Sequence, residues 1–188
     1  MGQRLLDLMI ARKPCRTLIA EGLMIVAYQN GVVESKFSSP TNSKGIRSKY
    51  KIDSIPTVLL ALTGPDGAAW RILIGDRSGK LTLLSLPHLL LVEEMQNHSQ
   101  PISCLSAQQR SGGLVILSGH EDGTVMAYGQ QLPSGSVQLF QVENTVDALR
   151  CESELIHVHS GWERKIVYWD GTPKQNPGQL QKRLPIVA

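Results

Sequence analysis

The hydrophobic residues of this chain fall into short runs, separated by turns rich in Gly, Pro, Ser, Asn and Asp. Such runs, rich in Ile, Val, Leu and Tyr, are typical of β-strands, and helical periodicity never persists for three turns. The run His88–Gln96 is ambiguous, because it could also form a short helix. The predicted strands are Leu23–Tyr28, Thr57–Leu62, Arg71–Ile74, Leu81–Leu86, Leu114–Leu117, Val125–Tyr128, Leu155–His159 and Lys165–Trp169. The pattern predicts an all-β fold, which could be a sandwich, a barrel or a propeller.

Four segments repeat the order strand, tight polar turn, strand. They end at Tyr28, Leu84, Tyr128 and Trp169, which are separated by 56, 44 and 41 residues. The last two spacings lie in the range of about 40–45 residues that four-stranded propeller blades occupy. The first spacing is longer, which we attribute to a polar insertion at 38–51. The repeat therefore predicts a β-propeller-like array of about four four-stranded antiparallel blades.

We expect these blades to form a single domain over residues 1–188. The expected blades cover approximately 1–40, 55–97, 98–145 and 146–188. The length allows a substantial core, and 41% hydrophobic with 19% charged residues excludes a disordered chain. The net charge of +3 is too small to indicate nucleic acid or membrane as a partner by itself.

The cysteines and the apolar segments point to a cytoplasmic protein. Cys15, Cys104 and Cys151 are far apart and form no CxxC motif, so we expect neither a disulfide framework nor a structural zinc site. The N-terminal apolar residues are interrupted by Asp7 and lack the pattern of a signal peptide. No apolar stretch approaches the length of a membrane span, so no membrane partner is expected.

The third repeat carries the most distinctive motif. His98 precedes a predicted strand, and the segment Ser118–Val125 joins a strand, a polar turn and a second strand that ends at Tyr128. The fourth repeat ends in a Trp-Asp pair, Trp169 and Asp170. This pattern resembles the WD-repeat β-propeller family, with Tyr128 in place of the usual Trp.

The resemblance implies a hydrogen-bonded tetrad that pins adjacent strands within one blade. The matching positions are His98, Ser118, Asp122 and Tyr128. The second repeat departs from the family, because Ser78 falls at the position of the Asp. The repeats are therefore degenerate, and the family implies a rigid scaffold that presents loops to protein partners.

Each motif that could carry chemistry also has a structural interpretation. The tetrad includes the residue types of a hydrolase triad, but no strained nucleophile turn accompanies it. His157 and His159 face one side of a strand and could bind a metal with His120, but no Cys or carboxylate completes the set. Gly75–Lys80 has the wrong spacing for a phosphate loop and lies between strands, so we predict a hairpin turn. We therefore predict no catalytic residue, no metal, no cofactor and no enzyme.

A basic insertion is the most suggestive surface segment. Its lysines and arginine surround Tyr50, and no acidic residue follows until Asp53. Such a segment could bind an acidic protein surface or single-stranded nucleic acid, although a solvated loop is commoner. With three residues on predicted turns, the expected partner-binding set is Lys44, Arg47, Lys49, Tyr50, Lys51, Arg77, His120 and Trp162.

These expectations indicate a non-enzymatic protein-interaction scaffold. Four blades are few for the family, and an open array would expose sheet edges and apolar blade faces. We therefore expect a homodimer, or a complex in which another subunit supplies the missing blades, ahead of a closed four-bladed monomer. The alternative is a nucleic-acid-associated protein that uses the basic insertion 44–51.

Overall fold

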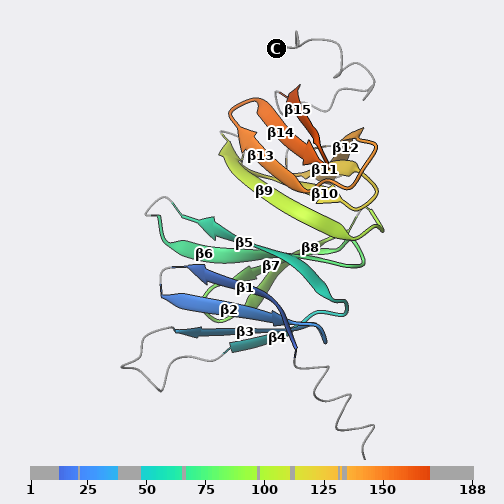
Figure 1. Ribbon diagram of the computed structural model, residues 1–188. Helices are drawn as coiled ribbons and strands as arrows, with labels where there is room; N and C mark the ends of the chain where they lie inside the picture. Colours follow the sequence, from blue (N-terminus) through green and yellow to red (C-terminus); the bar gives the residue numbers. More distant parts are fainter. Residues whose placement is uncertain are drawn as a thin grey trace, which may run out of the picture. The chain divides into compact units, whose positions relative to one another are not determined.

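The computed structural model describes residues 13–169, apart from 21, 38–47, 65–66, 97, 111–112, 131 and 133–134. These residues form four antiparallel sheets of three or four strands each, as Figure 1 shows. Within this described part, no helix has the length and the apolar character needed to cross a bilayer. The all-β prediction is confirmed.

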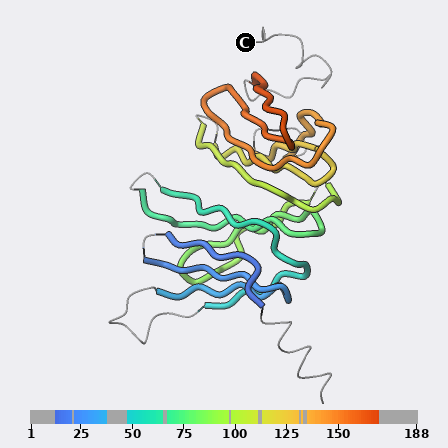
Figure 2. The backbone as a smooth tube through the Cα atoms, viewed as in Figure 1, coloured from blue at the N-terminus to red at the C-terminus, as the bar shows by residue number. Residues whose placement is uncertain are grey.

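The chain divides into two compact units, Met1–Pro101 and Ile102–Ala188. Each unit contains two sheets, and in each sheet the backbone runs back and forth through neighbouring strands (Figure 2). The units are described separately below. The single domain expected over residues 1–188 stays a prediction.

Sheets A and B make up the first unit. Sheet A contains β1 (Pro14–Ala20), β2 (Leu23–Tyr28), β3 (Val32–Phe37) and β4 (Ser48–Lys51) in that order. Sheet B contains β5 (Pro56–Thr63), β6 (Ala69–Asp76), β7 (Leu81–Ser85) and β8 (Leu90–Met95). Because side chains alternate across a strand, every second residue of β2 faces sheet B. The shared apolar cluster is Leu23, Ile25, Ala27, Val33, Ile52, Ile72, Ile74, Leu84 and Leu89.

Sheets C and D make up the second unit. Sheet C contains β9 (Ile102–Arg110), β10 (Gly113–His120), β11 (Thr124–Tyr128) and β12 (Ser136–Gln141). Sheet D has three strands in the described part, β13 (Ala148–Glu152), β14 (Leu155–Ser160) and β15 (Glu163–Tyr168). Their shared cluster is Cys104, Leu117, Val125, Ala127, Leu132, Leu139, Phe140, Val142, Val146, Ile156, Val158, Val167 and Trp169. The first strand of sheet C, β9, lies beside the first strand of sheet D, β13, just as β1 lies beside β5.

One glycine turn recurs between the second and third strands of sheets A, B and C. Gly31, Gly79 and Gly123 have φ values of 81°, 84° and 84°. At each glycine, an added Cβ would lie 2.1–2.3 Å from a carbonyl oxygen of the chain that follows the fourth strand of the same sheet. Only glycine combines a left-handed φ with this close approach. This turn therefore marks the true repeat of the chain.

The glycine turn corrects the alignment of the first repeat. The sequence pattern matched the β1–β2 hairpin to the later hairpins, but β1 and β2 are the first two strands of sheet A. The equivalent hairpin is β2–β3, which turns at Gly31. The phase was wrong by one strand, because the residues before Gly22 also look like a tight polar turn.

The expected insertion at 38–51 is also partly wrong. Residues 48–51 form β4, the fourth strand of sheet A, in which Tyr50 pairs with Val33 of β3. The first sheet therefore extends to Lys51 and not to about residue 40. Lysine-rich edge strands are common because charge discourages pairing with other chains. Residues 38–47 lie outside the described part.

The ambiguous run His88–Gln96 contains a strand. Leu90–Met95 forms β8 at the edge of sheet B, and the preceding residue Leu89 lies buried in a turn with a φ of 53°. Leu90, Leu91 and Val92 are all exposed, so neither face of this edge strand shows the usual alternation. This absence of alternation explains why a helix could be considered.

Candidate interaction surfaces and buried polar sites

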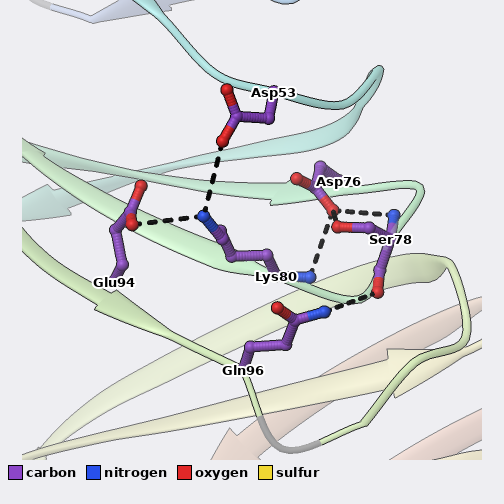
Figure 3. A network of polar contacts seen from close by, with 6 residues as sticks. All are labelled: Asp53, Asp76, Ser78, Lys80, Glu94 and Gln96. Atoms are coloured by element: carbon purple, nitrogen blue, oxygen red, sulfur yellow. Dashed lines mark hydrogen bonds and ion pairs between the residues drawn. The ribbon is translucent and has the colours of Figure 1, made fainter.

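The turn between β6 and β7 is held by the Asp76 carboxylate (Figure 3). Asp76 Oδ1 accepts hydrogen bonds from Ser78 N at 2.8 Å, from the Ser78 hydroxyl at 2.7 Å and from Lys80 N at 3.1 Å. A phosphate loop would present such backbone amides to an anion, and here a carboxylate of the chain occupies them. The hairpin turn predicted for Gly75–Lys80 is confirmed.

The Lys80 side chain connects this turn to two other segments of the first unit. Its Nζ lies 3.1 Å from Glu94 Oε2 on β8 and 3.9 Å from Asp53 Oδ2, which follows β4 (Figure 3). The hydrogen bond with Glu94 is the main reason why the pKa of Lys80 is raised. Gln96 Nε2 also donates to the Ser78 carbonyl at 3.1 Å. This polar network therefore fastens the turn to the edge of sheet B.

Three of the four predicted tetrad residues lie in sheet C. Burial raises the pKa of Tyr128, and the fully buried Ser118 side chain acts in the opposite direction. Asp122 Oδ1 accepts a hydrogen bond from Thr124 N at 3.0 Å and so holds the β10–β11 turn. His98 belongs to the first unit, and its place in the tetrad stays a prediction.

The expectation that His120 is an exposed partner-binding residue is wrong. His120 is the last residue of β10 and is fully buried, with its Nε2 2.8 Å from Ser118 Oγ. Alternation along β10 could have indicated this, because His120 shares a face with Ile116 and Ser118. A Ser–His pair at this distance has the spacing of a nucleophile and its base. Both side chains are fully buried, however, so a substrate does not reach them.

The three histidines considered for a metal site do not come together. His157 and His159 lie on one face of β14, as their spacing predicts, and His157 Nε2 lies 3.8 Å from Glu152 Oε2. His120 is buried in β10. Among the residues that the structure describes, no group of three His, Cys, Asp or Glu side chains could hold a metal ion.

The described part of the basic segment, Ser48–Lys51, is a strand of sheet A, and its side chains make contacts within the first unit. Lys49 Nζ lies 2.9 Å from a glutamate of β3, and the Lys51 ammonium donates to a backbone carbonyl of the β2–β3 turn. Tyr50 packs against the apolar cluster of the first unit, and burial raises its pKa. Lys44 and Arg47 lie outside the described residues. Nucleic-acid binding by this segment stays a prediction.

Two of the expected partner-binding residues project from turns. Arg77 lies in the β6–β7 turn and is exposed. Trp162 lies in the β14–β15 turn and is fully exposed. Exposed Trp and Arg side chains are frequent energetic anchors in protein interfaces. These two positions therefore keep the accessibility that a binding role requires.

A polar side chain near the start of a first strand joins neighbouring sheets in both units. Cys15 Sγ lies within hydrogen-bond distance of a β2 carbonyl (3.3 Å) and of the Pro56 carbonyl of sheet B (3.4 Å). The Ser103 hydroxyl of sheet C is likewise within hydrogen-bond distance of a β10 carbonyl (3.0 Å) and of the Val146 carbonyl before sheet D. Thr57 repeats the bond to its own sheet, at 3.1 Å. The two stacked pairs of sheets are therefore connected by the same kind of polar contact, which we call the polar joint.

Sheet D exposes the face that is turned away from sheet C, which we name the D face. Ile156 and Val158 pack toward sheet C, so the alternate residues of β14 lie on the D face. Among its apolar members, Ile166 is 48% exposed and Tyr168 37% exposed. The strand register places on this face Arg150, Glu152, Leu155, His157, His159, Arg164, Ile166 and Tyr168.

Sheet A has a corresponding face turned away from sheet B, which we name the A face. Leu23, Ile25 and Ala27 pack toward sheet B, so Met24, between the first two, lies on the A face. Ile19 is 68% exposed. The register places on this face Thr17, Ile19, Met24, Val26, Glu34, Lys36 and Lys49.

Comparison with known proteins identifies similar folds but no family. No protein-family model and no curated protein sequence matches the chain. The crystal structure of the computationally designed Ika4 protein matches with a TM-score of 0.67 and 12% identity, over 84% of this chain and 92% of Ika4. That of the designed Ika8 protein matches with a TM-score of 0.63 and 13% identity, over 84% of this chain and 46% of Ika8. The chain thus spans about half the length of Ika8, and these likenesses concern the fold alone.

Proposed function

We propose that this protein is a non-enzymatic protein-interaction scaffold, a WD-repeat-like propeller array that is completed by self-association or by a partner subunit. The observation that carries this proposal is the repeated stacking of sheets, which leaves the D face without another described sheet of its unit packed on it. Sheet A packs on sheet B and sheet C packs on sheet D, with the same alternate residues and the same polar joint. A stack of this kind gains stability from each added neighbour.

The likeness to WD-repeat blades supports the propeller arrangement. Three sheets have four antiparallel strands in sequence order, and the glycine turn recurs after 48 and then 44 residues. Propeller blades of about 40–45 residues have this strand order.

The polar clusters of the described chain favour binding over catalysis. Ser118 and His120 are fully buried, so this pair supports the interior of sheet C. The Asp76 carboxylate fills the amides of its own turn, and Lys80 is paired with Glu94. The large side chains that a partner could reach are instead aromatic and aliphatic, such as Trp162. Surfaces of this kind act through shape and buried apolar area.

The solution mass of the purified full chain tests this function. Size-exclusion chromatography with light scattering, run over a range of concentrations, should give at least twice the chain mass of 20.6 kDa, or a defined complex with a co-purified protein. Trp162→Ala should weaken a hetero-complex, with the exposed Leu90→Ala as a matched control on another strand. A monodisperse monomer that binds no protein at any concentration would contradict the proposal.

A further inference from the structure

We infer that the D face of one copy of this chain docks onto the A face of a second copy. The inference rests on the proposed function and names its partner and both contacting surfaces. We identify the partner as a second copy because each chain carries both surfaces of the proposed contact, one D face and one A face.

The stacking within each unit follows one rule. In the first unit, β2 turns Leu23, Ile25 and Ala27 toward the next sheet, where Ile72 and Ile74 of β6 receive them. Sheet C in the second unit likewise turns its alternate residues toward the next sheet, and β14 of sheet D receives them. In each unit, the second strand of the earlier sheet turns its forward face toward the later sheet, and the second strand of the later sheet meets it with its backward face.

The D face is a forward face, and none of the sheets described in the second unit packs on it. Counted back from the turn that follows each strand, His157 of β14 corresponds to Ile25 of β2. Likewise, Leu155 corresponds to Leu23, and His159 corresponds to Ala27. Ile25 and Ala27 are fully buried, whereas His159 is exposed and Ile166, which pairs with His157, is 48% exposed. The D face thus corresponds to a face that is buried in sheet A, but its own apolar residues are exposed to solvent.

The A face is the matching backward face. Met24 and Val26 of β2 hold the places that Ile156 and Val158 hold in β14, and these two β14 residues are the ones that receive sheet C. Ile19 pairs with Met24 and is 68% exposed, so the A face also presents apolar surface. One forward face and one backward face, on neither of which another described sheet of the same unit packs, make a head-to-tail pair of surfaces.

Several charged side chains on both faces are already paired with a neighbour on the same face. On the D face, Glu152 is paired with the Arg150 guanidinium and lies 3.8 Å from His157 Nε2. On the A face, Glu34 Oε1 lies 2.9 Å from Lys49 Nζ. Burying charges that are already paired avoids the largest desolvation penalty.

The length comparison supports a second copy as the occupant. A match over 84% of this chain takes up 92% of Ika4 but only 46% of Ika8. A polypeptide of roughly twice this length therefore matches this chain with less than half of its own length. Two copies of this chain supply the length of one such polypeptide.

Two charge substitutions test the pairing of these faces. Ile166→Arg places a charge on the D face and Ile19→Arg places one on the A face, and both residues are exposed enough for the fold to tolerate the change. Each variant alone should raise the dimer dissociation constant about 30-fold, the effect of losing an interface anchor. In an equimolar mixture, the intact D face of one variant meets the intact A face of the other, so the dimer should return. Light scattering reads the mass, and circular dichroism checks that each variant is folded.

The controls separate this inference from the proposed function. Leu90→Arg changes an equally exposed apolar residue outside both faces and should leave the mass unchanged. A wild-type dimer that survives both face substitutions, or a mixture that stays monomeric, overturns the docking of the D face on the A face but leaves the scaffold function. A monomer that binds a different protein does the same. A monomer without any protein partner overturns both.

Discussion

Replacing Gly123 in the β10–β11 turn by alanine should lower the free energy of unfolding by more than a left-handed alanine usually does. Gly123 has a φ of 84°, and an added Cβ would lie 2.1 Å from the Val142 carbonyl oxygen and 2.9 Å from that of Asn144. Ordinary contacts of a Cβ begin at about 3.4 Å. Both neighbours are backbone atoms, so neither can rotate away. The turn and the chain after β12 must therefore move apart.

The size of the effect follows from what the movement breaks. A left-handed alanine costs about 1–2 kcal/mol by itself. Separating the two segments also breaks the bond from Val142 N to the Gly123 carbonyl (3.0 Å) and strains the one from Gly123 N to the His120 carbonyl (3.1 Å). At about 1 kcal/mol for each bond, the free energy of unfolding should fall by about 3–4 kcal/mol. For a chain of this size, the melting temperature should drop by about 10 °C.

Gly161→Ala is the matched control for this measurement. Gly161 lies in the β14–β15 turn of the same unit, has a φ of 58°, and has no atom within 4 Å of the place of an added Cβ. It should lose only the conformational term, about 1 kcal/mol, or about 3 °C. Thermal melts followed by circular dichroism measure both variants. Equal losses in the two variants would refute the close approach at Gly123 and the repeated turn that depends on it.

Three further outcomes follow from individual contacts. Burial raises the pKa of the Cys104 thiol to about 11, so at pH 8 only about one molecule in a thousand carries the thiolate. A disulfide reagent should therefore label the other two cysteines first. Labelling of all three cysteines at one rate would contradict this. Ser103→Ala should lower the free energy of unfolding, measured in urea, by about 1–2 kcal/mol. The control Ser99→Ala, at an exposed position, should leave it unchanged. Equal effects of the two substitutions would argue against the polar joint between the sheets. The hydrogen bond with Lys49 lowers the pKa of Glu34, so its contribution to stability is present at neutral pH and is lost as the pH falls through the folded-state pKa. In Lys49→Met, an NMR titration should find a higher Glu34 pKa, and an unchanged value would exclude the ion pair.

The strands could be predicted from the sequence because their signals are local. The predicted strand Leu23–Tyr28 coincides with β2, and Leu155–His159 differs from β14 by one residue. Both are apolar runs that end at turn residues such as Gly or Ser. The sheet edges were harder to predict. Strand β4, Ser48–Lys51, is short and polar, and an isolated segment of this kind resembles a loop.

The phase of the repeat could not be read from local pattern alone. A hairpin formed by strands one and two resembles a hairpin formed by strands two and three, since both show two apolar runs around a polar turn. What separates them is the backbone that each glycine meets. Gly31 meets the carbonyl of Ile52, which follows the fourth strand. The strand order that brings these two residues together is a tertiary property.

The contacts that join neighbouring sheets depend on even longer separations. The Ser103 hydroxyl meets the carbonyl of Val146, and the Cys15 thiol meets that of Pro56, partners 43 and 41 residues away. A serine or cysteine at the start of a strand has many partners within reach in an extended chain. Only the stacking of one sheet on the next selects the carbonyl. The sequence therefore did not indicate these residues as contacts between sheets.

The repeated element of this chain is backbone geometry more than a side-chain network. The glycine turns of sheets A, B and C are capped by different side chains: Asn30 and Asp122 each accept from the amide two residues on, whereas Asp76 accepts from Ser78 and Lys80. All three caps hold a glycine with nearly the same φ against the same following segment. The side chains that cap the turn can therefore differ between sheets, while the glycine turn keeps the same strand order in all three.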